Sequence, residues 1–68
     1  MKFHEILRQR RLALRLTQEQ LAQRLGVSAP AVNKWERNNS YPDITLLPPL
    51  ARLLEVDLNT LLSFQEEL

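Results

Sequence analysis

The sequence predicts an all-α protein, folded as a compact bundle of five helices. Apolar residues recur at helical spacing through most of the 68 residues, and no stretch alternates strictly between apolar and polar residues as a half-buried strand would. Capping residues, one glycine and four prolines divide the chain into five segments. Because the chain has no cysteine and one histidine, neither a disulfide nor a zinc site is available, and helix packing must stabilise the fold.

The first predicted helix begins near the start of the chain and ends near Arg15. Its apolar residues fall on one side at helical spacing, while arginines crowd the remaining surface. This pattern is typical of a helix that covers a core with one face. The apolar residues are Phe3, Ile6, Leu7 and Leu14, and the arginines are Arg8, Arg11 and Arg15.

The second predicted helix has a strong start signal and a clear end. The hydroxyl of Thr17 can accept from a free backbone N–H, and Gln20, three residues later, completes a capping box. Leu16 and Leu21 are spaced as a hydrophobic staple across that start. The helix is expected to end at Gly26, the only glycine, which adopts the left-handed conformation at a helix C-terminus without steric cost.

A third helix is predicted to follow after one residue. Ser28 can cap it, and Pro30 falls in the first turn, where its missing N–H is not needed. The helix is expected to run to about Arg37, after which Asn38 can replace glycine as a left-handed cap. Residues 38–42 are expected to form a short polar loop.

The fourth segment contains two consecutive prolines. Pro48 and Pro49 remove backbone donors and are expected to push Leu47 away from helical geometry. We therefore expect a turn or a kinked segment over Asp43–Leu47. Regular helix is expected over Pro48–Leu54.

A fifth helix, capped by Asp57, is predicted over about Leu58–Ser63. Three apolar residues, Leu58, Leu62 and Phe64, either close the core or form an exposed dimer surface. The final residues, SFQEEL, are acidic and partly amphipathic and give no obvious stop to the fold. We interpret residues 1–68 as a single domain, and the ending suggests that it is the N-terminal part of a longer regulator.

Charge is unevenly distributed along the chain, although the formal net charge is only +1. Residues 1–37 carry eight basic and three acidic side chains, whereas residues 38–68 carry one basic and five acidic ones. This asymmetry is consistent with a first half that meets a polyanion. A solvated basic helix face would produce the same pattern.

The segment QEQLAQRLGVSAPAVNKWER, residues 18–37, has the features of a helix-turn-helix. Two short helices joined through Gly26 and Val27 must cross steeply. Ala22 is small where the helices would approach most closely. Trp35 belongs to the apolar pattern that would lock the crossing, so we interpret it as a core anchor rather than as a platform for base stacking.

The chain resembles the phage repressor/Cro type of helix-turn-helix protein, also called the XRE family, from about Phe3 to Phe64. The pieces that carry the resemblance are LTQEQLAQRLGVS, VNKWERNNSYPD and LLEVDLNTLL. The resemblance implies a lambda-repressor-like bundle of five helices whose third helix enters the DNA major groove, usually as a dimer on a two-fold related site. It also implies a partly buried structural ion pair between Arg11 and Glu36.

These implications assign contacts to double-stranded DNA. Base reading falls to the outward face of the third helix, where asparagine suits adenine, lysine suits guanine and small apolar groups suit the thymine methyl. Ala29 and Pro30 depart from the family, whose members often carry long polar residues there. Asn33 and Lys34 are therefore expected to do most of the reading, or DNA shape to contribute more. The expected base-reading residues are Ser28, Ala29, Pro30, Asn33 and Lys34.

Phosphate contacts are expected on both sides of that helix. Gln18, at the start of the second helix, has free amides and the helix dipole beside it and would set register rather than sequence. The loop after the third helix would contact a second phosphate, unless it is simply solvated. The expected phosphate contacts are Gln18, Arg37, Asn38, Asn39, Ser40 and Tyr41.

The sequence therefore predicts a cytoplasmic prokaryotic transcriptional regulator of the phage repressor/Cro type, which binds operator DNA as a homodimer and either represses or activates transcription. An antitoxin or protein-interaction module is the alternative. We expect no enzyme activity, because paired acid/base residues, a nucleophile context and a large cleft are all missing. No cofactor, no metal and no membrane segment is expected, since no apolar run approaches the length that crosses a bilayer.

Overall fold

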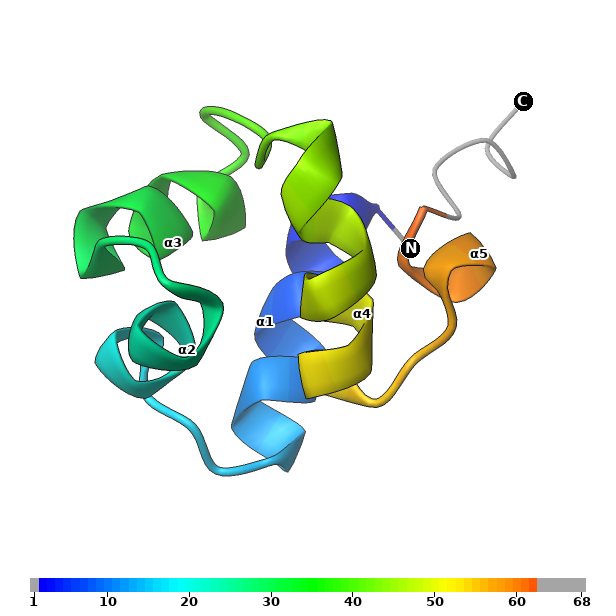
Figure 1. Ribbon diagram of the computed structural model, residues 1–68, viewed down its shortest axis with the longest axis horizontal. Coiled ribbons are helices and arrows are strands. Elements are labelled where there is room, and N and C mark those ends of the chain that lie inside the picture. Colours follow the sequence, from blue (N-terminus) through cyan, green and yellow to red (C-terminus); the bar gives the residue numbers. More distant parts are fainter. Residues whose placement is uncertain (1, 63–68) are drawn as a thin grey trace.

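The computed structural model describes residues 2–62, which form five α-helices and one short 3-10 helix and contain no strand (Figure 1). The predicted all-α architecture is thus confirmed. No helix among these residues has the length and apolar character needed to cross a membrane. In chain order the elements are α1 (Phe3–Ala13), α2 (Gln18–Leu25), α3 (Ala29–Glu36), η1 (Ile44–Leu46), α4 (Leu47–Leu54) and α5 (Leu58–Leu61).

The helices enclose one core. Helices α2 and α3 pack against each other on one side of the molecule, α1 and α4 lie side by side in the middle, and α5 lies on the far side (Figure 1). Trp35 on α3 is 5% exposed and belongs to this core, so it is an anchor, as expected, and not a surface for stacking bases. The core residues are Phe3, Ile6, Leu7, Leu16, Leu21, Ala22, Val32, Trp35, Leu50, Ala51, Leu54 and Leu61.

The helix starts use the predicted caps. The Gln20 N–H donates to Thr17 Oγ1 at 3.0 Å, and the Thr17 N–H donates to the Gln20 side chain at 2.9 Å, which completes the capping box. Asp57 caps α5, and its bond from the Thr60 backbone N–H holds the pKa of the carboxyl below its ordinary value. A lowered pKa means that this cap stabilises the fold above the ordinary carboxyl pKa and stops doing so as the pH falls through the lowered value.

The ends of α1, α2, α3 and α4 share one motif. Each is followed by a residue in the left-handed conformation, and the next N–H donates to the carbonyl five residues earlier, as in a Schellman motif. The sequence predicted this conformation at Gly26 and Asn38 but not at the other two positions. The left-handed residues are Arg15 (φ 60°), Gly26 (φ 82°), Asn38 (φ 62°) and Glu55 (φ 59°).

Glu55 lies at a strained position, because a side chain at positive φ costs about 1–2 kcal/mol. We expect Glu55→Gly to raise the free energy of unfolding by about 0.5–1 kcal/mol relative to Glu55→Ala. Glycine relieves the strain at positive φ, but it also loses more backbone entropy on folding, which cancels part of that gain. Glu55→Ala is the matched control: it removes the same charge from the helix C-terminus but keeps the Cβ. Urea unfolding of the two variants measures the difference, and equal stabilities would contradict this account of the helix end.

The expectation for Leu47 was wrong. Leu47 has α-helical angles (φ −64°, ψ −46°) and is the first residue of α4, although the following proline disfavours this conformation. Asp43 accepts from Thr45 at 3.0 Å and starts the 3-10 helix η1, which leads directly into α4. Both prolines then occupy the first turn of α4, where a helix needs no backbone N–H. Burial of Leu50 and Leu54 on that helix offsets the local strain.

The remaining helix boundaries differ from the predictions by small amounts. Helix α1 ends at Ala13 and α3 ends at Glu36, each slightly earlier than expected, because Leu14 and Arg37 are already caps. Helix α5 ends at Leu61 instead of Ser63, with Leu62 as its cap. Ser63 and Phe64 lie outside the described residues.

Candidate nucleic-acid interface

Helices α2 and α3 pack across each other around the turn at Gly26 (Figure 1). The Gly26 and Val27 N–H groups both donate to the Ala22 carbonyl, at 2.8 and 2.9 Å. These two hydrogen bonds fix where α2 ends and the chain turns. Ala22 is buried at the same place. Ser28 Oγ then accepts from the Ala31 N–H at 3.2 Å and starts α3. The turn therefore holds α3 at a fixed angle across α2 with one long face free.

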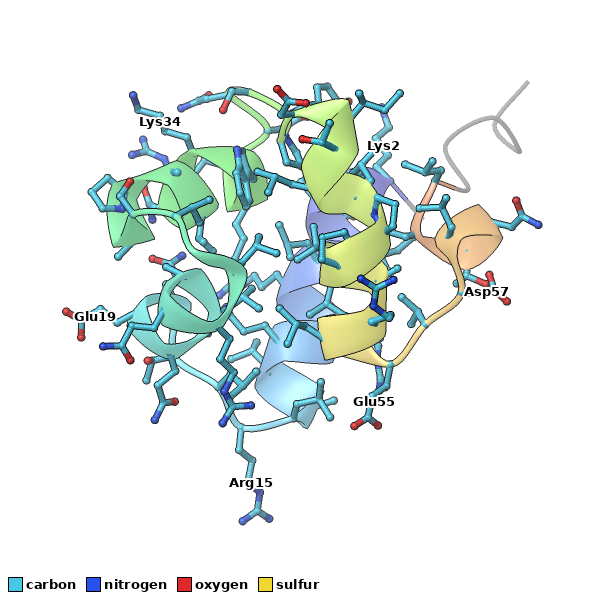
Figure 2. The ribbon with its side chains drawn as sticks, viewed as in Figure 1. Lys2, Arg15, Glu19, Lys34, Glu55 and Asp57 are labelled. Atoms are coloured by element: carbon cyan, nitrogen blue, oxygen red, sulfur yellow. The ribbon has the colours of Figure 1, made fainter. Side chains whose placement is uncertain are left out.

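The free face of α3 exposes Pro30 and Lys34, and the exposed Arg37 follows as the C-cap of the helix. These three residues are spaced at helical intervals, so they form one stripe. The Lys34 side chain points away from the body of the protein (Figure 2). The inward face of the same helix is anchored by Val32 and Trp35, which are buried. A rigid helix thus presents a basic surface to solvent.

The five expected base-reading residues lie together at this face, but they are not equally free. Ser28 is exposed, yet its hydroxyl already caps α3. Ala29 is half-buried and packs against the core. Pro30 and Lys34 are exposed, while Asn33 is half-buried and hydrogen-bonded within the protein.

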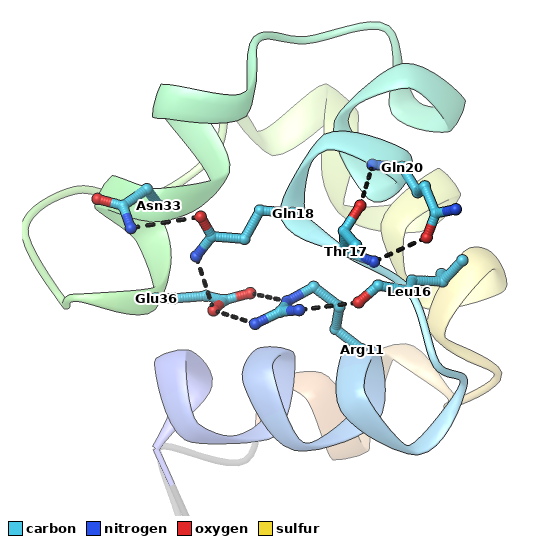
Figure 3. A network of polar contacts seen from close by, with 7 residues as sticks. All are labelled: Arg11, Leu16, Thr17, Gln18, Gln20, Asn33 and Glu36. Carbon is cyan, nitrogen blue, oxygen red and sulfur yellow. Dashed lines mark hydrogen bonds and ion pairs between the residues drawn. The ribbon is translucent and has the colours of Figure 1, made fainter.

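An ion pair joins α1 to α3 beneath this surface (Figure 3). Arg11 Nε and Nη2 donate to Glu36 Oε2 and Oε1 at 2.6 and 3.0 Å, a bidentate arrangement. Arg11 Nη1 donates to the Leu16 carbonyl at 2.8 Å. The two side chains are only 10% and 5% exposed, so this pair is largely removed from water.

Gln18 extends the ion pair into a hydrogen-bonded chain that reaches the outer face of α3 (Figure 3). Gln18 Nε2 donates to Glu36 Oε1 at 3.1 Å, and Asn33 Nδ2 donates to Gln18 Oε1 at 3.3 Å. The chain links α1, α2 and α3 through side chains alone. No sequence pattern indicated this coupling, because the partners are 15 and 18 residues apart.

An open depression of about 260 Å³ lies where α1, α2 and α3 meet. Arg8 and Arg37 line this depression and are exposed, so its edge is positively charged. Arg8 was not among the expected contacts, since nothing in its spacing distinguishes it from the other arginines of α1. The lining residues are Arg8, Arg11, Gln18, Asn33, Glu36 and Arg37.

The loop after α3 continues the polar surface. Asn38, Asn39 and Ser40 are exposed, and the left-handed Asn38 directs the chain away from α3. Tyr41 is 66% exposed, and its ring lies 5.5 Å from the ring of Phe3, which ties the loop to the start of α1. No group of His, Cys, Asp or Glu side chains in the described part of the chain could hold a metal ion.

A pair of short helices that pack across each other around a tight turn, with the second presenting a free face, defines the class of helix-turn-helix domains. The helix-turn-helix family model matches residues 7–61, and the chain belongs to this family. Among curated proteins, it is 42% identical over 66 residues to the HTH-type transcriptional activator BcrR of Enterococcus faecalis, which covers 97% of this chain and 32% of BcrR. The chain thus spans about a third of that relative.

Solved structures show the same fold. The P22 c2 repressor protein in complex with a synthetic operator superposes with a TM-score of 0.86 at 32% identity, covering 91% of this chain and 94% of the repressor chain. The SinR protein/SinI protein complex matches with a TM-score of 0.81 at 29% identity, covering 98% of this chain and 65% of the other. The lambda-repressor-like fold is therefore confirmed.

Proposed function

We propose that this chain binds double-stranded DNA sequence-specifically as part of a prokaryotic transcriptional regulator, with α3 in the major groove. The observation that carries the proposal is the free face of α3, which exposes Lys34 and is followed by Arg37, while the opposite face is anchored in the core. Two similarities support it: a transcriptional activator in E. faecalis and a repressor crystallised on its operator. A regulator of this kind works in the cytoplasm, where it occupies its operator and needs no enzyme activity.

Base reading is assigned to the middle of α3. Lys34 is exposed and carries a flexible cation suited to guanine O6 and N7, and Asn33 offers an amide suited to adenine N6 and N7. Pro30, and to a lesser extent the half-buried Ala29, can contact a thymine methyl group. Ser28 contributes through its backbone position at the start of α3, because its hydroxyl is occupied by the cap.

Phosphate contacts are assigned to the two rims of this surface. Gln18 lies at the N-terminus of α2, where free N–H groups and the helix dipole attract an anion. On the other rim, the exposed Arg37 and the loop residues supply a cation and polar donors. The proposed phosphate contacts are Gln18, Arg37, Asn38, Asn39, Ser40 and Tyr41, and Arg8 joins them through the shared depression.

We further propose that the regulator binds as a homodimer on a two-fold related site and carries a further C-terminal domain. The length of BcrR, of which this chain spans about a third, supports the further domain. Leu58, exposed at the start of α5, is the best described candidate for a dimer contact, whereas Leu62 packs against the core. Gel filtration over a range of concentrations measures whether these residues are sufficient for dimerisation.

A protein-interaction module, such as an antitoxin, is the second candidate. It is favoured by an open apolar depression of about 430 Å³ beside η1 and the end of α5. Ile44, 77% exposed, and Tyr41 lie on its lining. A chain that bound no preferred DNA sequence but retained this surface would support that function.

Two substitutions, one on α3 and one at its C-cap, separate base reading from phosphate contact. With a duplex selected from a randomised pool, we expect Lys34→Ala to relax the preference at one base pair by about 5- to 150-fold. Arg37→Ala should instead weaken all sequences alike and reduce the slope of log K against log salt by about 1 per protomer. Fluorescence anisotropy on duplexes with single base changes measures both. Equal losses on every duplex for Lys34→Ala would contradict its role as a base reader.

A further inference from the structure

The hydrogen-bonded chain beneath α3 has a fixed direction, set at its buried end. A carboxylate only accepts hydrogen bonds, and Glu36 accepts two from Arg11 and one from Gln18. Gln18 can therefore approach Glu36 only with Nε2, which leaves its Oε1 facing the other way. Asn33 approaches that Oε1 at 3.3 Å and can do so only with Nδ2. The charge of Glu36 thus dictates the orientation of two amide groups in succession.

This constraint decides which groups Asn33 can offer to DNA. The Asn33 amide has two N–H donors and one carbonyl acceptor, and one N–H is taken by Gln18. One donor and one acceptor remain, which are the two groups that adenine N7 and N6 require. An unrestrained asparagine could rotate its amide by half a turn and exchange the positions of the donor and the acceptor.

We infer that Gln18 is a positioning residue that holds Asn33 in the orientation that reads adenine. The inference rests on the proposed function, and it adds a role to the phosphate contact expected of Gln18, whose Nε2 keeps a second N–H for that contact. Ala29 and Pro30 cannot make such hydrogen bonds with their side chains. Recognition by α3 therefore depends on residues outside it, through Gln18 on α2 and Arg11 on α1.

The test uses Gln18→Met, which keeps the length of the side chain but removes the amide. Gln23→Met is the matched control, because Gln23 is an exposed glutamine on the same helix and none of the network bonds involves it. Asn33→Ala identifies the base pair that Asn33 reads. Affinities are measured for the selected duplex and for duplexes carrying each single base change, after thermal unfolding has shown that every variant is folded at the assay temperature.

We expect Gln18→Met to lose about 5- to 150-fold of discrimination at the same base pair as Asn33→Ala, and the double variant to lose no more than Asn33→Ala alone. Discrimination at the base pair assigned to Lys34 should stay unchanged in Gln18→Met. A uniform loss of affinity with full discrimination would overturn the positioning role and leave Gln18 as a phosphate contact. Failure of the unsubstituted chain to prefer any duplex would instead overturn the proposed function.

Discussion

Glu36→Ala is expected to destabilise the domain by about 3–5 kcal/mol, because it leaves the buried Arg11 guanidinium without its counter-charge. Arg11 is only 10% exposed in side chain and would retain one bond, to the Leu16 carbonyl. Gln18 would lose its acceptor at the same time. Since a chain of this length has a total stability of about 3–10 kcal/mol, the variant should lose a third or more of its stability and unfold at a much lower urea concentration.

The double variant Arg11→Met/Glu36→Leu distinguishes the cost of an unpaired buried charge from the net contribution of the ion pair to stability. It removes both charges and replaces them with apolar side chains, so we expect it to recover much of the stability lost in Glu36→Ala. Urea unfolding followed by circular dichroism measures all three proteins. Glu36→Ala within 1 kcal/mol of the unsubstituted chain would show that the charge is not buried in solution as the structure describes.

Trp35→Ala is expected to lower the free energy of unfolding by about 3–5 kcal/mol, because it leaves a cavity in the core beneath α3. Trp35 is buried among residues of the single core cluster and forms the inward anchor of α3 together with Val32. Trp35→Phe is the control, since it keeps an aromatic ring in the same place and should preserve both the fold and DNA binding. Unfolding curves and anisotropy on the selected duplex check the two expectations.

A different outcome would restore the alternative that Trp35 stacks on a base. In that case Trp35→Phe would weaken DNA binding strongly while leaving the unfolding curve unchanged. The structure argues against this result, because a ring that is 5% exposed has no face available to a nucleotide.

Local sequence patterns predicted the parts of the fold that local chemistry controls. The starts of α2, α3 and α5 could be predicted because Thr17, Ser28 and Asp57 each cap a helix with their own side chains. The end of α2 could be predicted because glycine at positive φ is a distinctive signal. Each of these features depends on residues within one turn of each other.

The misses have tertiary causes. Arg15 and Glu55 adopt left-handed angles that their residue types disfavour, because packing on either side determines where the helices end. Leu47 is helical before a proline because η1 delivers the chain into α4. In each case the gain from core burial exceeds a local cost, and only the cost at Leu47, before a proline, is visible in the sequence.

In the candidate site, too, some features follow from local sequence patterns and others depend on tertiary structure. The outward stripe of α3 follows from helical spacing once Trp35 and Val32 are recognised as inward-facing. The ion pair of Arg11 and Glu36 was inferred from family resemblance, because residues 25 apart show no local relationship. The bonds from Gln18 to Glu36 and from Asn33 to Gln18 depend on how α2 crosses α3, so only the structure reveals that the residues expected to contact phosphate and base are coupled.

The central claim is that α3 reads DNA sequence, and selection from a randomised duplex pool tests it most directly. The selected duplex and a scrambled control are then compared over a salt series. We predict a two-fold symmetric motif, with log K falling against log salt with a slope of about −4 to −8 for a dimer. Shallow binding without a motif, from a folded chain, would contradict the claim and direct attention to a protein partner.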